Sequence, residues 1–179
     1  MTRYKAEREV RKQPFQWYEE IILQRGAFST LLGLTISWKQ AQKKGKWRAL
    51  AVGDSCLFQA RDEHILESFP VDNSSAFGVR PILISNNSLQ NNPVPFAAKF
   101  ASGRWQIGDT FYLLTDALAF WFLREIETGQ KPLGILRNFE RGKSRSFGKW
   151  ISHLRENKFI RNDDVTLLTI KICPSSNNL

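Results

Sequence analysis

Residues 108–120, GDTFYLLTDALAF, place a carboxylate between an apolar strand and an apolar helix. The run FYLLT has strand character, and the following ALAFWFLREIETG predicts a helix that ends at Gly129. An unpaired carboxylate inside a buried strand costs several kcal/mol, so Asp116 is expected just past the end of the strand. There it can cap the helix as a favoured N-cap residue, or it can bind a cation. Both interpretations are open at this point.

Composition limits the alternatives. The 179 residues predict a single domain with a real core, and 42% hydrophobic with 12% aromatic residues argues against disorder. The net charge of +9 favours anionic partners without choosing among nucleic acid, phosphate and acidic protein. Both cysteines, Cys56 and Cys173, lie in apolar runs and are predicted to be small core residues. With no signal peptide and no apolar run long enough to span a membrane, a reduced, cytoplasmic setting is expected.

The first half of the chain is predicted to be rich in strands. Residues 1–25 are predicted to form a basic arm and a helix, in which Trp17, Ile21 and Ile22 fall at helical spacing. A long strand is predicted over 28–38, followed by a basic turn around Gly45. The segments WRALAVG, SCLFQARD and ILESF each predict a strand. Their turn-length spacing indicates antiparallel pairing.

The second half alternates helices with strands. Residues 71–103 are rich in proline, asparagine and serine, which predicts irregular structure with at most one short element. After a loop, a Gly-Asp turn and the strand and helix around Asp116, residues 145–158 place apolar side chains on one helix face. The segment DDVTLLTIKI predicts the last strand. The two histidines, His64 and His153, lack a neighbouring acid or cysteine pattern and are expected near the surface.

Three further acidic motifs have local explanations. Asp163 and Asp164 lie in a polar turn that opens the last strand, where solvated acids are common. Gly53-Asp54-Ser55 between two apolar strands is typical of a hairpin turn, with Asp54 accepting from backbone amides. Gly108-Asp109 repeats this dipeptide and receives the same turn interpretation.

The order of these motifs resembles the C-terminal two-thirds of the metal-dependent PP2C-type serine/threonine phosphatases. The resemblance covers roughly residues 26–172. The matching segments, in chain order, are Ser29-Thr30-Leu31, Val52-Gly53-Asp54-Ser55, Gly108-Asp109, Leu113 to Leu118, and Asp163-Asp164-Val165-Thr166.

The resemblance implies an α+β fold, an α-β-β-α sandwich of two antiparallel sheets, over residues 26–174. It also implies two Mn²⁺ or Mg²⁺ ions at one end of the sandwich, with Asp116 and Asp163 as metal ligands. Asp164, where the family usually has Asn, and Thr115 would support those ligands, whereas Gly53, Asp54 and Ser55 would form a structural turn. A metal-activated water would attack a phosphoserine or phosphothreonine monoester, because hard cations activate water and neutralise phosphoryl charge.

The departures from the family pattern affect the metal site most. The sequence has no D-G-x-G-G motif and no counterpart of the phosphate-binding arginine. Ala117 and Cys56 replace a Gly and an Arg that are usual there. Two carboxylates cannot hold two octahedral ions, so half a metal site is expected. We therefore expect a sandwich incomplete on its N-terminal side: a fragment, a chain completed by a second chain or homo-oligomer, or one capped by its own N-terminal helix through Phe15, Trp17 and Tyr18.

Three functions follow from these motifs. The first is a phosphoprotein phosphatase, or part of one, and the second is a catalytically inactive phosphatase-like binding or regulatory module. The third, ranked last, is a basic nucleic-acid binder, since lysines and arginines beside aromatic residues can hold phosphates and stack bases. A solvated hairpin tip explains the first of its two basic clusters equally well. The clusters are Lys39, Lys43, Lys44, Lys46, Arg48 with Trp47, and Arg137, Arg141, Lys143, Arg145, Lys149.

Overall fold

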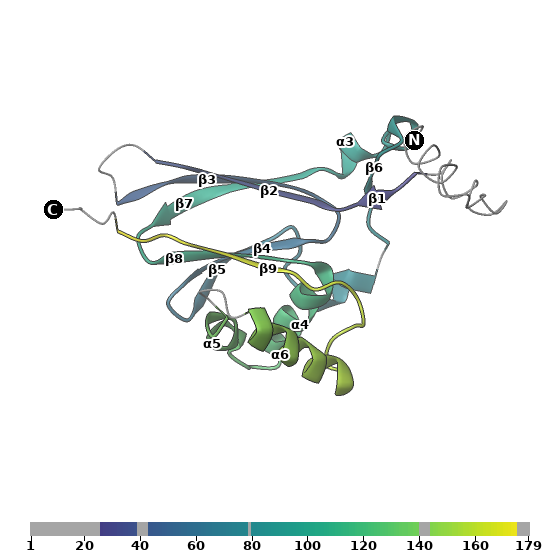
Figure 1. Ribbon diagram of the computed structural model, residues 1–179. Coiled ribbons are helices and arrows are strands. Elements are labelled where there is room, and N and C mark those ends of the chain that lie inside the picture. Colours follow the sequence, from purple (N-terminus) through teal and green to yellow (C-terminus); the bar gives the residue numbers. More distant parts are fainter. Residues whose placement is uncertain (1–25, 39–42, 79, 140–143, 175–179) are drawn as a thin grey trace, which may run out of the picture.

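The computed structural model describes residues 26–38, 43–78, 80–139 and 144–174. Two antiparallel sheets lie face to face (Figure 1). One has three strands in the order β2-β3-β7, namely Leu31–Ser37, Lys44–Val52 and Lys99–Gln106. The other has four strands in the order β5-β4-β8-β9, namely His64–Phe69, Cys56–Arg61, Asp109–Leu114 and Leu167–Lys171. A small third sheet pairs β1 (Phe28–Ser29) with β6 (Ile84–Ser85).

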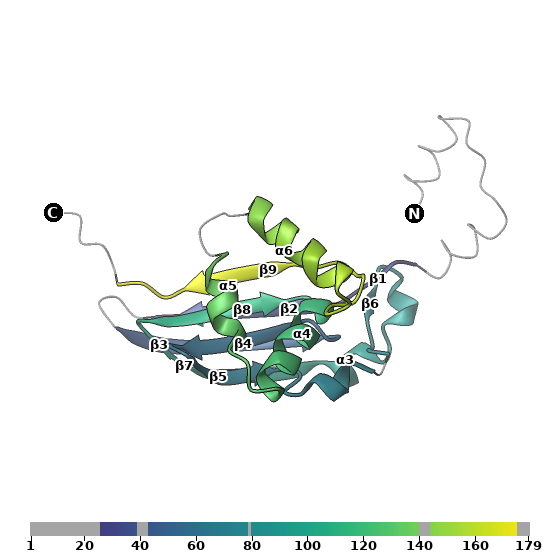
Figure 2. The ribbon, with the colours of Figure 1, turned by 90° about the horizontal axis from the view of Figure 1, so that it is seen from below.

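Three helices cover the outer face of the four-stranded sheet (Figure 2). They are α4 (Asp116–Glu127), α5 (Pro132–Arg137) and α6 (Ser144–Glu156). Short helical turns precede β7, namely η1 (Ser74–Gly78), η2 (Ser88–Gln90) and α3 (Val94–Ala97). The predicted α+β sandwich of antiparallel sheets is therefore confirmed. Within the described ranges, one of the two expected helical layers is formed, and the outer face of β2-β3-β7 has no such layer.

The core consists of two apolar layers that share β4 and β8. Alternate side chains of a strand point to opposite faces, so Leu57 and Phe111 pack between the sheets. Phe58 and Tyr112 point the other way and pack under the helices. All four side chains are 0% exposed, because β4 and β8 are covered on both faces.

Two predicted strand assignments need correction. The strand predicted over 28–38 is divided at Thr30, because β1 pairs with β6 whereas β2 pairs with β3. Residues 71–103, for which the sequence predicts at most one short element, contain β6, three helical turns and the start of β7, which pairs with β3 over eight residues. Gly45 lies within β3, where it pairs with Trp105 of β7, and not in a turn. An added Cβ would lie 2.2 Å from the carbonyl oxygen of Ser37, so this strand position needs glycine.

The Gly53-Asp54-Ser55 segment is a turn, but the hairpin prediction is wrong. β3 pairs with β2 and β7, whereas β4 pairs with β5 and β8, so this segment carries the chain from one sheet to the other. Gly53 has φ +101, and an added Cβ would lie 2.6 Å from Cγ2 of Thr30. The turn at Gly108, with φ +98, makes the reverse crossing from β7 to β8. Both crossings need the left-handed backbone that favours glycine.

The cysteine and histidine predictions have mixed outcomes. Cys56 is 0% exposed, and burial raises the pKa of its thiol to about 12, as suits an inert core residue. The prediction for Cys173 is wrong, because that residue lies exposed beyond the end of β9. His64 and His153 are both exposed, as predicted. The predicted helix over residues 1–25 lies outside the described residues. No helix in the described part of the chain is long and apolar enough to cross a membrane.

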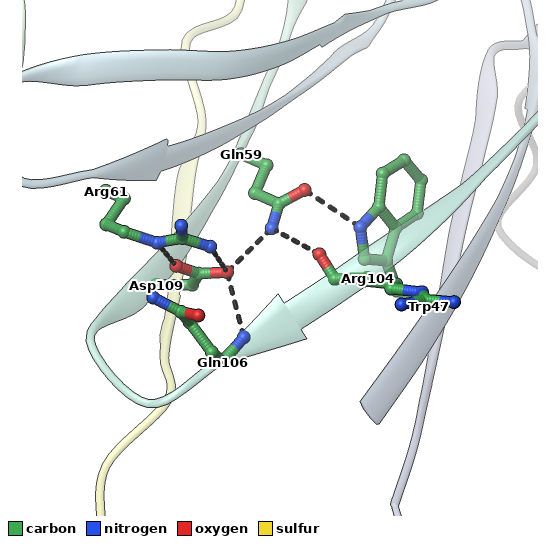
Figure 3. Close-up of polar contacts among 6 residues, drawn as sticks. All are labelled: Trp47, Gln59, Arg61, Arg104, Gln106 and Asp109. Carbon is green, nitrogen blue, oxygen red and sulfur yellow. Dashed lines mark hydrogen bonds and ion pairs between the residues drawn. The ribbon is translucent and has the colours of Figure 1, made fainter. Parts of the chain in front are cut away.

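Asp109, the first residue of β8, is 0% exposed and anchors a polar network inside the sandwich (Figure 3). Its Oδ1 accepts from Nε of Arg61 at 2.6 Å, and its Oδ2 accepts from Nη2 of the same side chain at 3.2 Å. Oδ2 also accepts from Nε2 of Gln59 at 2.7 Å and from the backbone N–H of Gln106 at 3.1 Å. Asp109 therefore lies beside the predicted turn, but its carboxylate also binds side chains in the interior of the sandwich.

Gln59 extends this network to the three-stranded sheet. Its Nε2 also donates to the carbonyl oxygen of Arg104 in β7 at 2.9 Å. Its Oε1 accepts from Nε1 of Trp47 in β3 at 2.8 Å (Figure 3). One buried amide therefore ties both sheets together at the end where β7 passes into β8.

Neutralising Asp109 is expected to destabilise the protein far more than neutralising an exposed acid. In Asp109→Asn the new amide would present N–H donors to Arg61 and Gln59, so we expect a loss of about 3 kcal/mol in the free energy of unfolding. The matched control is Glu63→Gln, which removes the acid of the exposed Glu63–Arg137 pair and should cost less than about 1 kcal/mol. Urea unfolding of both variants measures the difference. Equal losses would show that the network does not hold the sheets together.

Candidate functional site

Three chain segments meet at the end of the four-stranded sheet opposite the Asp109 network. The register places Cys56 of β4 beside Leu114 of β8, and Leu114 beside Leu167 of β9. The segment before β4 carries Asp54, the residue two beyond the end of β8 is Asp116, and the loop before β9 carries Asp163. Pairing of the strands thus gathers acids that are far apart in sequence.

Asp116 is the first residue of α4 and is half-buried. Its interpretation as an N-cap is wrong, because Thr115 occupies the cap position. A carboxylate in the first helical turn is favoured by the helix dipole. Asp116 is therefore held at the sheet end by the strand-to-helix junction that the sequence predicted.

Thr115 joins this junction to the loop before β9. Its hydroxyl donates to the carbonyl oxygen of Asp164 at 3.0 Å and accepts from the backbone N–H of Thr166 at 3.0 Å. The backbone N–H of Thr115 donates to the carbonyl oxygen of Thr166 at 3.3 Å. These bonds hold the end of β8 against the loop before β9, and Asp164 takes part in them through its backbone carbonyl.

Asp163 is exposed, and its carboxylate is engaged within its own turn. Oδ1 accepts from the backbone N–H of Asp164 at 2.8 Å, and the backbone N–H of Asp163 donates to the carbonyl oxygen of Arg161 at 3.0 Å. Arg155 donates to the carbonyl oxygen of Asp163. These bonds stabilise the turn itself, which is the local explanation that the sequence also allowed.

Asp54 contributes a third carboxylate to the same end of the sandwich. Burial raises the pKa of its carboxyl, the charge of Asp116 raises it further, and Asp163 acts in the same direction. The backbone bond of Asp54 and the charge of Arg161 oppose this rise. The sequence predicts only a turn at Asp54, because the approach of Asp54 to Asp116 depends on the pairing of β4 with β8.

The fit of a metal to this site can be judged from the residues. The described part of the chain contains no group of three or more His, Cys, Asp or Glu side chains placed to hold a metal ion. Asp116 and Asp163 could contribute oxygen ligands on one side of a cation, but a two-ion centre needs ligands from several directions. The described residues therefore do not fit a complete two-metal centre.

The two basic clusters differ in their placement. Lys44, Lys46 and Arg48 are exposed on β3, but Trp47 between them is 1% exposed and cannot stack on a base. Lys39, Arg141 and Lys143 lie outside the described residues. Four other members of the clusters are described and lie outside β3, namely Lys43, Arg137, Arg145 and Lys149. Of these, Arg137 pairs with Glu63.

Comparison with known proteins identifies a structural likeness. No family model and no curated protein matches the chain. The chain is similar to the phosphatase domain of the cell fate determinant SpoIIE from Bacillus subtilis, with 16% identity, a TM-score of 0.48, and coverage of 89% of this chain and 66% of that chain. For the same domain presoaked with Mn, the values are 16% identity, a TM-score of 0.47, and coverage of 92% and 63%. The chain thus spans about two thirds of the length of the solved domains that it matches.

We expect Asp54→Asn to stabilise the protein near neutral pH. A raised carboxyl pKa in the folded state means that stability is lost as pH rises through that pKa, because ionisation is penalised there. The thermal midpoint of the variant should exceed that of the wild type at about pH 7, and this gain should disappear as pH falls toward the ordinary value of 3.8.

Thermal melts across this pH range check the prediction, with Asp62→Asn as the control. Asp62 is an exposed acid with φ 51 in the turn after β4, a conformation that asparagine also accepts. Its replacement should change the midpoint little. A gain from Asp54→Asn that stays constant with pH would show that ionisation of Asp54 is not its cause.

Proposed function

We propose that the chain is a PP2C-like phosphatase module that acts on phosphorylated serine or threonine side chains of proteins. Asp116 and Asp163 would supply one side of a Mn²⁺ or Mg²⁺ site, and further ligands would come from outside the described residues or from a second chain. The observation that carries this proposal is the convergence of Asp54, Asp116 and Asp163, from three segments, at one end of the sandwich. Neighbouring carboxylates repel each other unless a cation lies among them, so their convergence favours a cation site.

Binding of a phosphoprotein without hydrolysis is the second candidate. The observation that favours it is the engagement of the Asp163 carboxylate in a hydrogen bond to its own turn. An acid used in this way is a structural element that needs no metal. The two candidates share the fold and the proposed phosphoprotein partner, and they differ in turnover and metal dependence.

Hydrolysis of p-nitrophenyl phosphate with and without Mn²⁺ separates the two candidates. If the chain is a metal-dependent phosphatase, hydrolysis should require Mn²⁺. Asp116→Asn should then lower kcat/KM by about 100-fold or more, because loss of a residue that only hydrogen-bonds a metal ligand already costs about 10–100-fold in activity. Asp62→Asn, which neutralises an exposed acid at the opposite end of β4, should leave the rate unchanged. A Mn²⁺-dependent rise in the thermal midpoint that is lost in Asp116→Asn provides a readout independent of turnover.

The opposite result is equally informative. A folded chain that neither hydrolyses the substrate nor responds to Mn²⁺ would contradict the phosphatase proposal. Binding of a phosphoserine peptide, measured against its unphosphorylated form, would then test the second candidate. Equal affinity for the two peptides would contradict that candidate as well.

A further inference from the structure

The outer face of the three-stranded sheet carries basic and apolar side chains in separate zones. Trp47, Ala49, Ala101 and Trp105 point into the core, so their strand neighbours point outward. We call this surface the outer basic face. Its members are Lys44, Lys46, Arg48 and Arg104 in a basic zone, and Leu31, Leu50 and Phe100 in an apolar zone. In Figure 1 these strands form the upper layer, on the side away from α4, α5 and α6.

The basic zone concentrates positive charge on one surface. Lys46 lies directly opposite Arg104 in the register of β3 with β7, and Arg48 is two residues farther along the same strand. Like charges directly opposite each other on a sheet destabilise it. In the described part of the chain no acidic side chain pairs with any of these cations. The repulsion between these cations lowers the stability of the chain on its own. An acidic ligand bound over them would remove this repulsion, which would explain why the cations lie together.

The apolar zone adjoins the basic zone on the same face. Leu50, which is half-buried, lies directly opposite Phe100, which is 76% exposed. Leu31, on β2, is 42% exposed. Contiguous exposed apolar side chains rimmed by polar residues mark sites of protein interaction.

We propose that the outer basic face binds an acidic amphipathic helix of a partner protein. The row of Leu50 and Phe100 is four residues from the row of Lys46 and Arg104, which corresponds to about 13 Å along a strand. A helix laid along the strands covers that distance in about nine residues. Apolar side chains on one part of such a helix would contact Leu50 and Phe100, and acids about two turns away would reach the basic zone.

Charge and chemistry favour this occupant over two others. A second copy of the chain, with net charge +9, would bring the same cations against one another. A nucleic acid would satisfy the basic zone through its phosphates but would leave Leu31 and Leu50 without an apolar partner. The face lies on the sheet that does not carry Asp116, so this inference does not rest on the proposed phosphatase function.

A designed peptide of about 18 residues, one helix as long as the face, tests the proposal on the full chain. Leucines at helical spacing occupy one half of the peptide and glutamates the other half. A second peptide has the same composition in scrambled order, and an oligothymidine represents nucleic acid. Fluorescence anisotropy should show that the patterned peptide binds at least about tenfold more tightly than the scrambled one, and more tightly than the oligothymidine.

Variants locate the binding on the outer basic face. The double substitution Arg48→Glu with Arg104→Glu should weaken binding by about tenfold or more, and Phe100→Ser should weaken it by about tenfold. Matched controls lie on the helical side of the molecule, where Lys149 and Phe159 are also exposed. Lys149→Glu and Phe159→Ser should change the affinity by less than about twofold.

A charge-reversed peptide controls for the possibility that the substitutions weaken binding by unfolding the protein. When lysines replace the glutamates, the peptide should bind the Arg48→Glu, Arg104→Glu variant more tightly than the wild type, a gain that unfolding cannot produce. The proposal is overturned if the scrambled peptide binds equally well. Tighter binding of oligothymidine, or a concentration-dependent dimer that Phe100→Ser dissociates, would overturn it in favour of nucleic acid or of a second copy.

Discussion

The burial of β4 and β8 on both faces is the constraint on which the other layers depend. Leu57 and Phe111 need a second sheet against them, and Phe58 and Tyr112 need helices. The three-stranded sheet covers the first pair, and the helices α4 and α6 cover the second pair. The two buried strands therefore require a layer on each of their faces. Because alternation along a strand is strict, a shift of one residue in register would move every one of these side chains to the wrong layer.

The same register decides what each acid can do. Asp109 begins β8 and is drawn into the interior, where Arg61 and Gln59 satisfy it. Asp116 follows the other end of β8, where the helix start leaves it half-buried and near other carboxylates. Both residues lie within the 13-residue stretch 108–120. Their different environments follow from the end of the strand at which each one lies.

The sequence was sufficient where local periodicity decides the structure. It predicted β8, a helix directly after that strand, and the apolar face of α6, because those patterns are complete within about a dozen residues, although α4 starts at Asp116 and ends at Glu127. It was not sufficient where the partner is distant. A Gly-Asp pair between two apolar strands suits a hairpin and an inter-sheet crossing equally, and β7 becomes a strand only by pairing with β3. The electrostatic effect of Asp116 on Asp54 and the Asp109 network arise from the same long-range pairing.

The distribution of charge would also orient a partner on the outer basic face. The apolar row of Leu50 and Phe100 lies toward the end of β3 that leads into Asp54, whereas Lys46 and Arg104 lie toward the opposite end. The carboxylates at the first end repel acidic groups, and the cations at the second attract them. An acidic helix therefore has one favourable direction along the strands, with its acids away from Asp54 and Asp116. Bound in that direction, it would leave the carboxylate end of the sandwich uncovered, so the partner and a ligand at the proposed Asp116 site could bind at the same time.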